Sequence, residues 1–222
     1  MITRFVPLLT CTAALALVAG CTSSGGPGTV VTVTKHVTAP VPHPSTSAKS
    51  TSAGAPPPPR NLTKLPGTCD NLLPDGTVFQ AIGVNSLAGV DAFVVGQPEA
   101  DIGRVGYLNC RYGVTGSGAA AVPKIEIGIS LYKTAGDAAS RVSSTVADYT
   151  GHAATATQTT VDGRPATLLT GGAGAGYDEP LLVVASGQRT VAVSIASSVA
   201  SGAKASQDAT ALAALALKNT GG

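Results

Sequence analysis

The composition of the chain changes sharply near residue 66, and this change limits compact folding to the part that follows. Residues 22 to about 66 consist mainly of Ser, Thr, Pro, Gly, Ala and Val and contain no Asp, Glu, Phe, Tyr or Trp. Such a segment cannot bury enough apolar surface to offset the entropy of ordering its backbone. We therefore predict a disordered stalk over residues 21–66. The remainder, residues 67–222, is long enough for one domain with its own core.

The N-terminus predicts export. Arg4 precedes an apolar run from Phe5 to Ala19, so residues 1–20 have the pattern of a signal peptide. The residues before Cys21, Leu-Val-Ala-Gly, resemble the lipobox of bacterial lipoproteins. This resemblance implies a diacylglyceryl thioether on Cys21, cleavage before it and acylation (palmitate) of the new N-terminus. The expected location is the extracytoplasmic face of the cell membrane, with the lipid as anchor.

Two alternatives for this leader stay open. One is an ordinary secretory peptide that leaves Cys21 as a plain thiol. The other is a transmembrane anchor, which is disfavoured because the apolar run is shorter than the roughly 20 residues needed to span a bilayer.

The cysteines agree with an oxidising compartment. Cys11 leaves with the signal peptide and Cys21 is modified, so Cys69 and Cys110 remain. An even pair in an exported domain predicts one disulfide bond. A metal site is the alternative, but the pair lacks CxxC spacing and has no histidine nearby.

The net charge of +2 conceals an asymmetry between stalk and domain. All acidic residues lie after residue 66, whereas the stalk carries only cations: Lys35, Lys49, Arg60 and Lys64. The stalk cations could attract anionic lipid headgroups or serve solubility alone. The mildly acidic domain lacks the basic patch with interleaved aromatic residues that a nucleic-acid binder needs, so no nucleic-acid partner is expected.

Hydrophobic periodicity predicts an α+β domain. Residues 124–133 alternate in polarity, with Ile125, Ile127 and Ile129 on one face, as expected of a half-buried strand. Thr134 and Asp137 resemble a capping box that begins a helix, and Asp162-Gly163 is a strong hairpin signal. A loop-rich stretch is expected up to Gly103. The predicted order is αββαββββα, an antiparallel sheet with helices packed against it, with elements at residues 75–83, 105–114, 124–133, 134–149, 155–161, 165–170, 181–185, 190–196 and 203–218.

Two motifs carry a family resemblance. The segments CDNLLPDGTVFQAIG and LNCRYG resemble uncharacterised actinobacterial (mycobacterial-type) cell-envelope lipoproteins, which have a Cys-Asp-x-Leu-Leu opening and a second cysteine before an aromatic residue. The resemblance covers most of residues 67–218. It implies a sheet-and-helix fold similar to PsbP-like domains and a location in the envelope, and it implies no reaction.

No residue set predicts catalysis, a metal or a cofactor. His152 is the one histidine of the domain, and a cation just past a helix end is favoured by the helix dipole. The glycine-rich run 171–176 lacks the Lys-Ser/Thr of a phosphate loop and precedes a strand, so it is interpreted as a strand connection. Asp178-Glu179 and the pair Glu99 and Asp101 are interpreted as solvated loop carboxylates.

Three functions follow from these observations. The favoured hypothesis is a binding or accessory module at the envelope that recognises a protein or a wall component. A carrier of a small apolar ligand or lipid, held between sheet and helix, is the alternative. An enzyme is the least favoured, because the domain offers a single histidine. A roomy apolar cavity would favour the carrier, whereas clustered aromatic residues or arginines would favour recognition.

Overall fold

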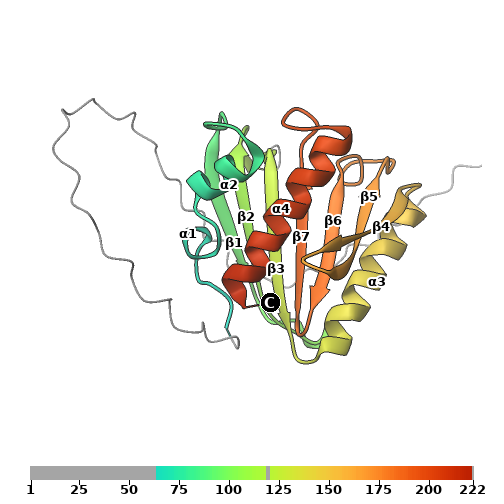
Figure 1. Ribbon diagram of the computed structural model, residues 1–222. Coiled ribbons are helices and arrows are strands. Elements are labelled where there is room, and N and C mark those ends of the chain that lie inside the picture. The colour runs from blue at the N-terminus through green and yellow to red at the C-terminus, as the bar shows by residue number, and fades with distance from the viewer. Residues whose placement is uncertain (1–63, 119–120, 222) are drawn as a thin grey trace, which may run out of the picture.

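The computed structural model describes residues 64–118 and 121–221. The predicted signal peptide, Cys21 and nearly all of the predicted stalk lie outside the described residues. The described chain is an α+β fold in which seven antiparallel strands form one sheet, in the order β1-β2-β3-β7-β6-β5-β4. Helices pack against this sheet, and helix α4 crosses it diagonally (Figure 1). The predicted fold class is therefore correct.

The helices and strands agree with most of the predicted elements. The helices are α1 (Cys69–Leu72), α2 (Asp75–Ile82), α3 (Ala135–Gly151) and α4 (Gly202–Thr220), with a 3-10 turn η1 (Ala100–Ile102). The strands are β1 (Val90–Gly96), β2 (Arg104–Val114), β3 (Ile125–Tyr132), β4 (Thr155–Val161), β5 (Arg164–Thr170), β6 (Leu181–Ser186) and β7 (Arg189–Ile195).

The predicted order αββαββββα misses α1 and β1. Strand β1 lies inside the stretch predicted to be loop-rich, at the edge of the sheet, and pairs only with β2. Its pairing shifts in register between Val90 and Ala92. The bulge breaks the strict alternation that identifies a strand in a sequence. In α2, Asp75 occupies the first turn and Pro74 holds the N-cap position.

The predicted local signals form as expected. Thr134 and Asp137 make both hydrogen bonds of a capping box at the start of α3. Asp162 and Gly163 take positive φ angles of 47° and 75°, as the two central residues of a tight hairpin turn do. In α3, Ala138 is buried, whereas Ala135 at the first position of the helix is exposed.

The main core lies between α4 and one face of the sheet. Alternate residues of β2, β3 and β7 point into it, including Leu108, Ile127 and Val193, each at most 1% exposed. Helix α4 contributes Leu212 and a series of alanines. These small side chains let the helix lie close to the sheet, and the absence of Trp from the chain fits a core built from aliphatic residues.

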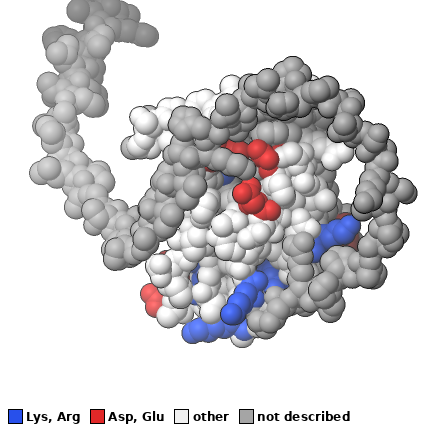
Figure 2. All heavy atoms as spheres, turned by 90° about the vertical axis from the view of Figure 1, so that its left-hand side faces the viewer, with Lys and Arg blue, Asp and Glu red and all other residues white. Residues whose placement is uncertain are grey.

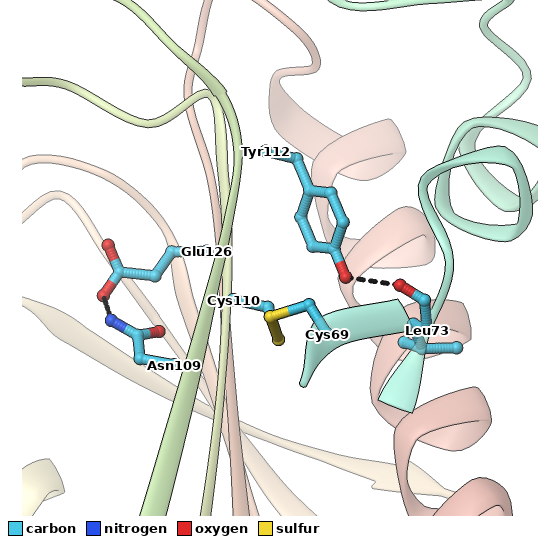
Figure 3. The surroundings of a disulfide bond; sticks show 6 residues. All are labelled: Cys69, Leu73, Asn109, Cys110, Tyr112 and Glu126. Atoms are coloured by element: carbon cyan, nitrogen blue, oxygen red, sulfur yellow. Dashed lines mark hydrogen bonds between the residues drawn. A yellow bond between two sulfur atoms is a disulfide. The ribbon is translucent and has the colours of Figure 1, made fainter. Parts of the chain in front are cut away.

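The predicted disulfide joins Cys69 to Cys110, with Cα atoms 5.6 Å apart. It fastens α1 to the centre of β2 (Figure 3). Beside it, the buried Tyr112 hydroxyl donates a 2.6 Å hydrogen bond to the carbonyl of Leu73. Asn219 at the end of α4 donates to the carbonyl of Leu72 at 2.7 Å. Together these links hold α1 to both the sheet and the last helix.

Charged residues are few in this chain. The face shown in Figure 2 carries small separate groups of both signs within a mostly uncharged surface. This matches a chain in which only 12% of the residues are charged.

Candidate functional site

The second face of the sheet is only partly covered. Helix α3 packs there, with its contacts on strands β3 to β7. Between α3 and the sheet lies an open cleft of about 1020 Å³. The cleft is lined by residues of β2, β3, β6 and β7, by α3 and by the loop between β5 and β6.

The floor of the cleft consists of side chains that point away from the main core. Strand register places them in three rows across β2, β3 and β7: Glu126–Ser194, Asn109–Gly128–Ala192 and Tyr107–Ser130–Thr190, and Arg111 lies next to Glu126 outside the lining. The rows are polar on β2, and the residues that follow on β3 and β7 are mostly small. Within the middle row, Ala192 contributes only a methyl group, and the side chains of Tyr107 and Asn109 lie over Gly128.

A polar network occupies the β2 side of the floor. Asn109 donates a 2.6 Å hydrogen bond from Nδ2 to Oε1 of Glu126, and Nε of Arg111 lies 3.6 Å from Oε2 of the same carboxylate. Figure 3 shows Asn109 and Glu126 on the opposite side of the strands from the disulfide. Asn109 is only 7% exposed, and its Oδ1 is buried without a hydrogen-bond partner. A buried acceptor of this kind is unfavourable unless some donor reaches it.

Tyr107 is positioned by two glycines on neighbouring strands. A Cβ on Gly96 would lie 2.8 Å from Cδ1 of Tyr107, and one on Gly128 would lie 3.4 Å from its Cε2. The ring therefore occupies space that only glycines leave free, and it is half-buried. The guanidinium of Arg104 lies 5.2 Å from the ring centre. Burial, followed by the negative charge of Glu126, raises the pKa of the Tyr107 hydroxyl, which keeps it a neutral donor and acceptor.

The ion pair of Arg104 corrects one expectation from the sequence. Glu99 was expected to be a solvated loop carboxylate, but its Oε2 lies 2.6 Å from Nη2 of Arg104. The backbones of the two residues also form an isolated bridge next to η1.

An aromatic cluster shapes the rim of the cleft at the C-terminal end of α3. The Tyr149 and Tyr177 rings meet edge to face with centres 4.8 Å apart, and His152 stacks on Tyr177 at 3.7 Å. The Tyr177 hydroxyl donates to Asp148 at 3.0 Å, and the Tyr149 hydroxyl donates to the carbonyl of Gly176 at 3.0 Å. These contacts hold the glycine-rich loop against α3.

His152 has a structural role at the end of α3. It is the C-cap residue of α3, and its carbonyl accepts a 2.7 Å hydrogen bond from the backbone of Ala173. The glycine-rich run is the connection between β5 and β6, as interpreted from the sequence. Asp178 and Glu179 line the cleft. Glu179 also accepts a hydrogen bond from the backbone of Ser197 at 2.8 Å.

Glu126, Gly128 and Ser130 lie on the opposite face of the predicted strand 124–133 from its isoleucines. Sequence reasoning identified none of the residues of the cleft as a site. The signal for the site is long-range, because Asn109, Ala192 and Tyr149 are brought together by strand register and by the packing of α3.

Comparisons with known proteins assign no family. No family model matches the chain, and no curated protein matches it either. Among solved structures, the extracellular domain of PknH from Mycobacterium tuberculosis is similar with a TM-score of 0.39 and 13% sequence identity, covering 67% of this chain and 94% of that one. This likeness is too weak to support a function. The resemblance to envelope lipoproteins with PsbP-like domains stays a prediction.

Two features are absent from the described residues. No helix in them is both long and apolar enough to cross a membrane. Within residues 64–118 and 121–221 no three His, Cys, Asp or Glu side chains converge as metal ligands would.

Proposed function

We propose that this protein is a binding module held at the outer face of the cell membrane by a lipid on Cys21, and that the cleft beside α3 is its binding site. The observation that carries the proposal is the cleft itself, about 1020 Å³ in volume. Ligand pockets typically measure roughly 300–1,000 Å³ and combine apolar walls with a few convergent polar groups. Asn109 and Glu126, which a hydrogen bond joins, supply such groups.

Export and anchoring rest on the leader and the cysteines. The lipobox before Cys21 supports lipidation, and the Cys69–Cys110 disulfide is typical of a domain that matures in an oxidising compartment. Intact-mass analysis of the membrane-bound protein tests this part. The expected mass begins at Cys21 and includes acyl chains, whereas an unmodified thiol on the membrane-bound chain would contradict the anchor.

Binding is favoured over the two alternatives by the character of the cleft. A lipid carrier needs an enclosed apolar cavity, but this cleft is open and its β2 side is polar. Catalysis at neutral pH most readily uses a histidine, and the ring of His152 is stacked on Tyr177 at the rim.

The proposal is tested by variants in which a bulky side chain fills the cleft. Ala192→Phe places a ring on the floor, and Ser194→Phe does the same one row away. Ser143→Phe adds the same ring on an exposed position of α3 outside the cleft and serves as the matched control. Each protein is incubated with small molecules extracted from its own cell envelope and examined by native mass spectrometry. The parent and Ser143→Phe are expected to carry a bound mass that both cleft-filling variants lack. Equal loading of all four proteins, or of none, would refute a binding cleft.

A further inference from the structure

The charges of the cleft are nearly balanced. Three cationic and four anionic side chains line it: Arg104, Lys124, Arg141, Glu126, Asp148, Asp178 and Glu179. A site for a phosphate-rich ligand would need a clear excess of positive charge. The balance instead suits a ligand without net charge that presents many donors and acceptors.

The uncharged lining combines aromatic rings with planar polar groups. Tyr107 lies on the floor, with its ring beside Gly128, and Tyr149 lies on the α3 wall. The negative face of an aromatic ring attracts weakly polarised C–H groups and excludes water from them. Asn109 and Glu126 offer planar amide and carboxylate groups nearby. A sugar ring matches both features, because its C–H face is apolar and its edge carries hydroxyls.

The buried Oδ1 atom of Asn109, which has no hydrogen-bond partner, supports a sugar as the ligand. Its Nδ2 is used by Glu126, which fixes Oδ1 as the end without a partner. Oδ1 and the Tyr107 hydroxyl lie 3.8 and 3.5 Å from the position of a Cβ on Gly128, so the two polar atoms converge over the same glycine. A sugar hydroxyl can donate to one group and accept from another at once.

We propose that the cleft binds a neutral carbohydrate, which stacks on Tyr107 and Tyr149 and donates a hydroxyl hydrogen bond to Asn109. The inference rests on the proposed function, since it names the ligand class of the same cleft. Asn109, Tyr107 and Tyr149 are binding residues in this proposal, and Glu126 positions Asn109.

The experiment is calorimetric titration of the lipidated full chain in a zwitterionic detergent without a sugar headgroup. The probes are tetrasaccharides of glucose, mannose and N-acetylglucosamine, with oleate as the apolar comparison. At least one tetrasaccharide is expected to bind saturably. Tyr107→Leu and Asn109→Ala should each raise its Kd about tenfold or more, which corresponds to about 1.4 kcal/mol. Tyr107→Phe should retain binding, because it keeps the ring.

Two controls distinguish the loss of ring stacking from a general loss of folding. Gln158→Ala removes an amide from the exposed strand β4, outside the cleft, and should leave the Kd unchanged. Tyr149→Leu and Tyr149→Phe repeat the ring comparison on α3, so the test stands even if a floor variant unfolds.

The possible outcomes test the class of ligand and the position of the binding site separately. Saturable oleate binding without sugar binding, or equal sugar affinity in Tyr107→Leu and Tyr107→Phe, overturns the carbohydrate inference and leaves the cleft as a binding site. Sugar affinity that Ala192→Phe does not reduce places the sugar elsewhere and overturns the carbohydrate inference for this cleft. An absence of saturable sugar binding up to the solubility of the probes also overturns the inference, whereas the cleft-filling test judges the cleft independently.

Discussion

The two faces of the central sheet use the same strands for opposite purposes. On the face under α4, Leu108, Cys110 and Ile127 are at most 1% exposed and belong to one continuous apolar core. On the face toward α3, their sequence neighbours Asn109 and Glu126 form a polar network at the floor of an open cleft. Strand alternation therefore separates stability from binding chemistry at single-residue spacing. Substitutions on the first face should affect folding, and those on the second should affect binding.

The largest effect is expected from the disulfide, which belongs to the core face. It closes a loop across a sequence separation of 41 residues. Removing it in the double variant Cys69→Ser/Cys110→Ser should lower the free energy of unfolding by about 4 kcal/mol, from the entropy of the unfolded chain. Urea unfolding measures the change. Cys21→Ser is the control and should be neutral. A loss below about 1 kcal/mol would mean that α1 is held chiefly by its hydrogen bonds.

An intermediate effect is expected at Tyr112, also on the core face. Tyr112→Phe leaves the carbonyl of Leu73 without its 2.6 Å partner and should cost about 1–2 kcal/mol at neutral pH. Burial, followed by the charges of Asp91, Asp70 and Asp75, raises the pKa of the Tyr112 hydroxyl above its usual value of 10.0.

The raised pKa of Tyr112 gives the same variant a distinct pH dependence. Because the unfolded chain loses this proton first, the contribution of Tyr112 to stability is complete below pH 10 and declines as the pH rises further. Above pH 10 the free energy of unfolding of the parent should therefore fall more steeply than that of Tyr112→Phe, by about 1.4 kcal/mol per pH unit. Chemical denaturation at several alkaline pH values checks this, and parallel slopes would contradict it.

The sequence predicted the core face better than the cleft face. Strand β3 was identified from the alternation of its isoleucines, and the α3 capping box and the 162–163 turn were identified from adjacent residues. These signals are local, and each arises within a few residues. Strand β1 was missed because its bulge and edge position weaken the alternation. The cleft was missed because it depends on which strands become neighbours: β3 pairs with β7 across a long stretch of sequence, and nothing in either strand alone specifies that pairing.

The smallest effect on stability is expected at Asn109, which tests the contrast between the faces within one strand. Asn109→Ala removes a hydrogen bond to a carboxylate, worth about 1.5–3 kcal/mol, but also removes a buried acceptor without a partner, whose desolvation costs about 1–3 kcal/mol.

These two contributions oppose each other, so the free energy of unfolding should change by no more than about 1 kcal/mol. The neighbouring Leu108→Ala, on the core face of the same strand, should cost about 3 kcal/mol because it leaves a cavity in the core. Urea unfolding of the two variants gives the comparison directly. Similar losses for both would show that the cleft face carries stability as well. If Leu108→Ala lowers the free energy of unfolding strongly and Asn109→Ala lowers it little, the amide of Asn109 contributes little to the fold. Its polar atoms are then available for ligand binding.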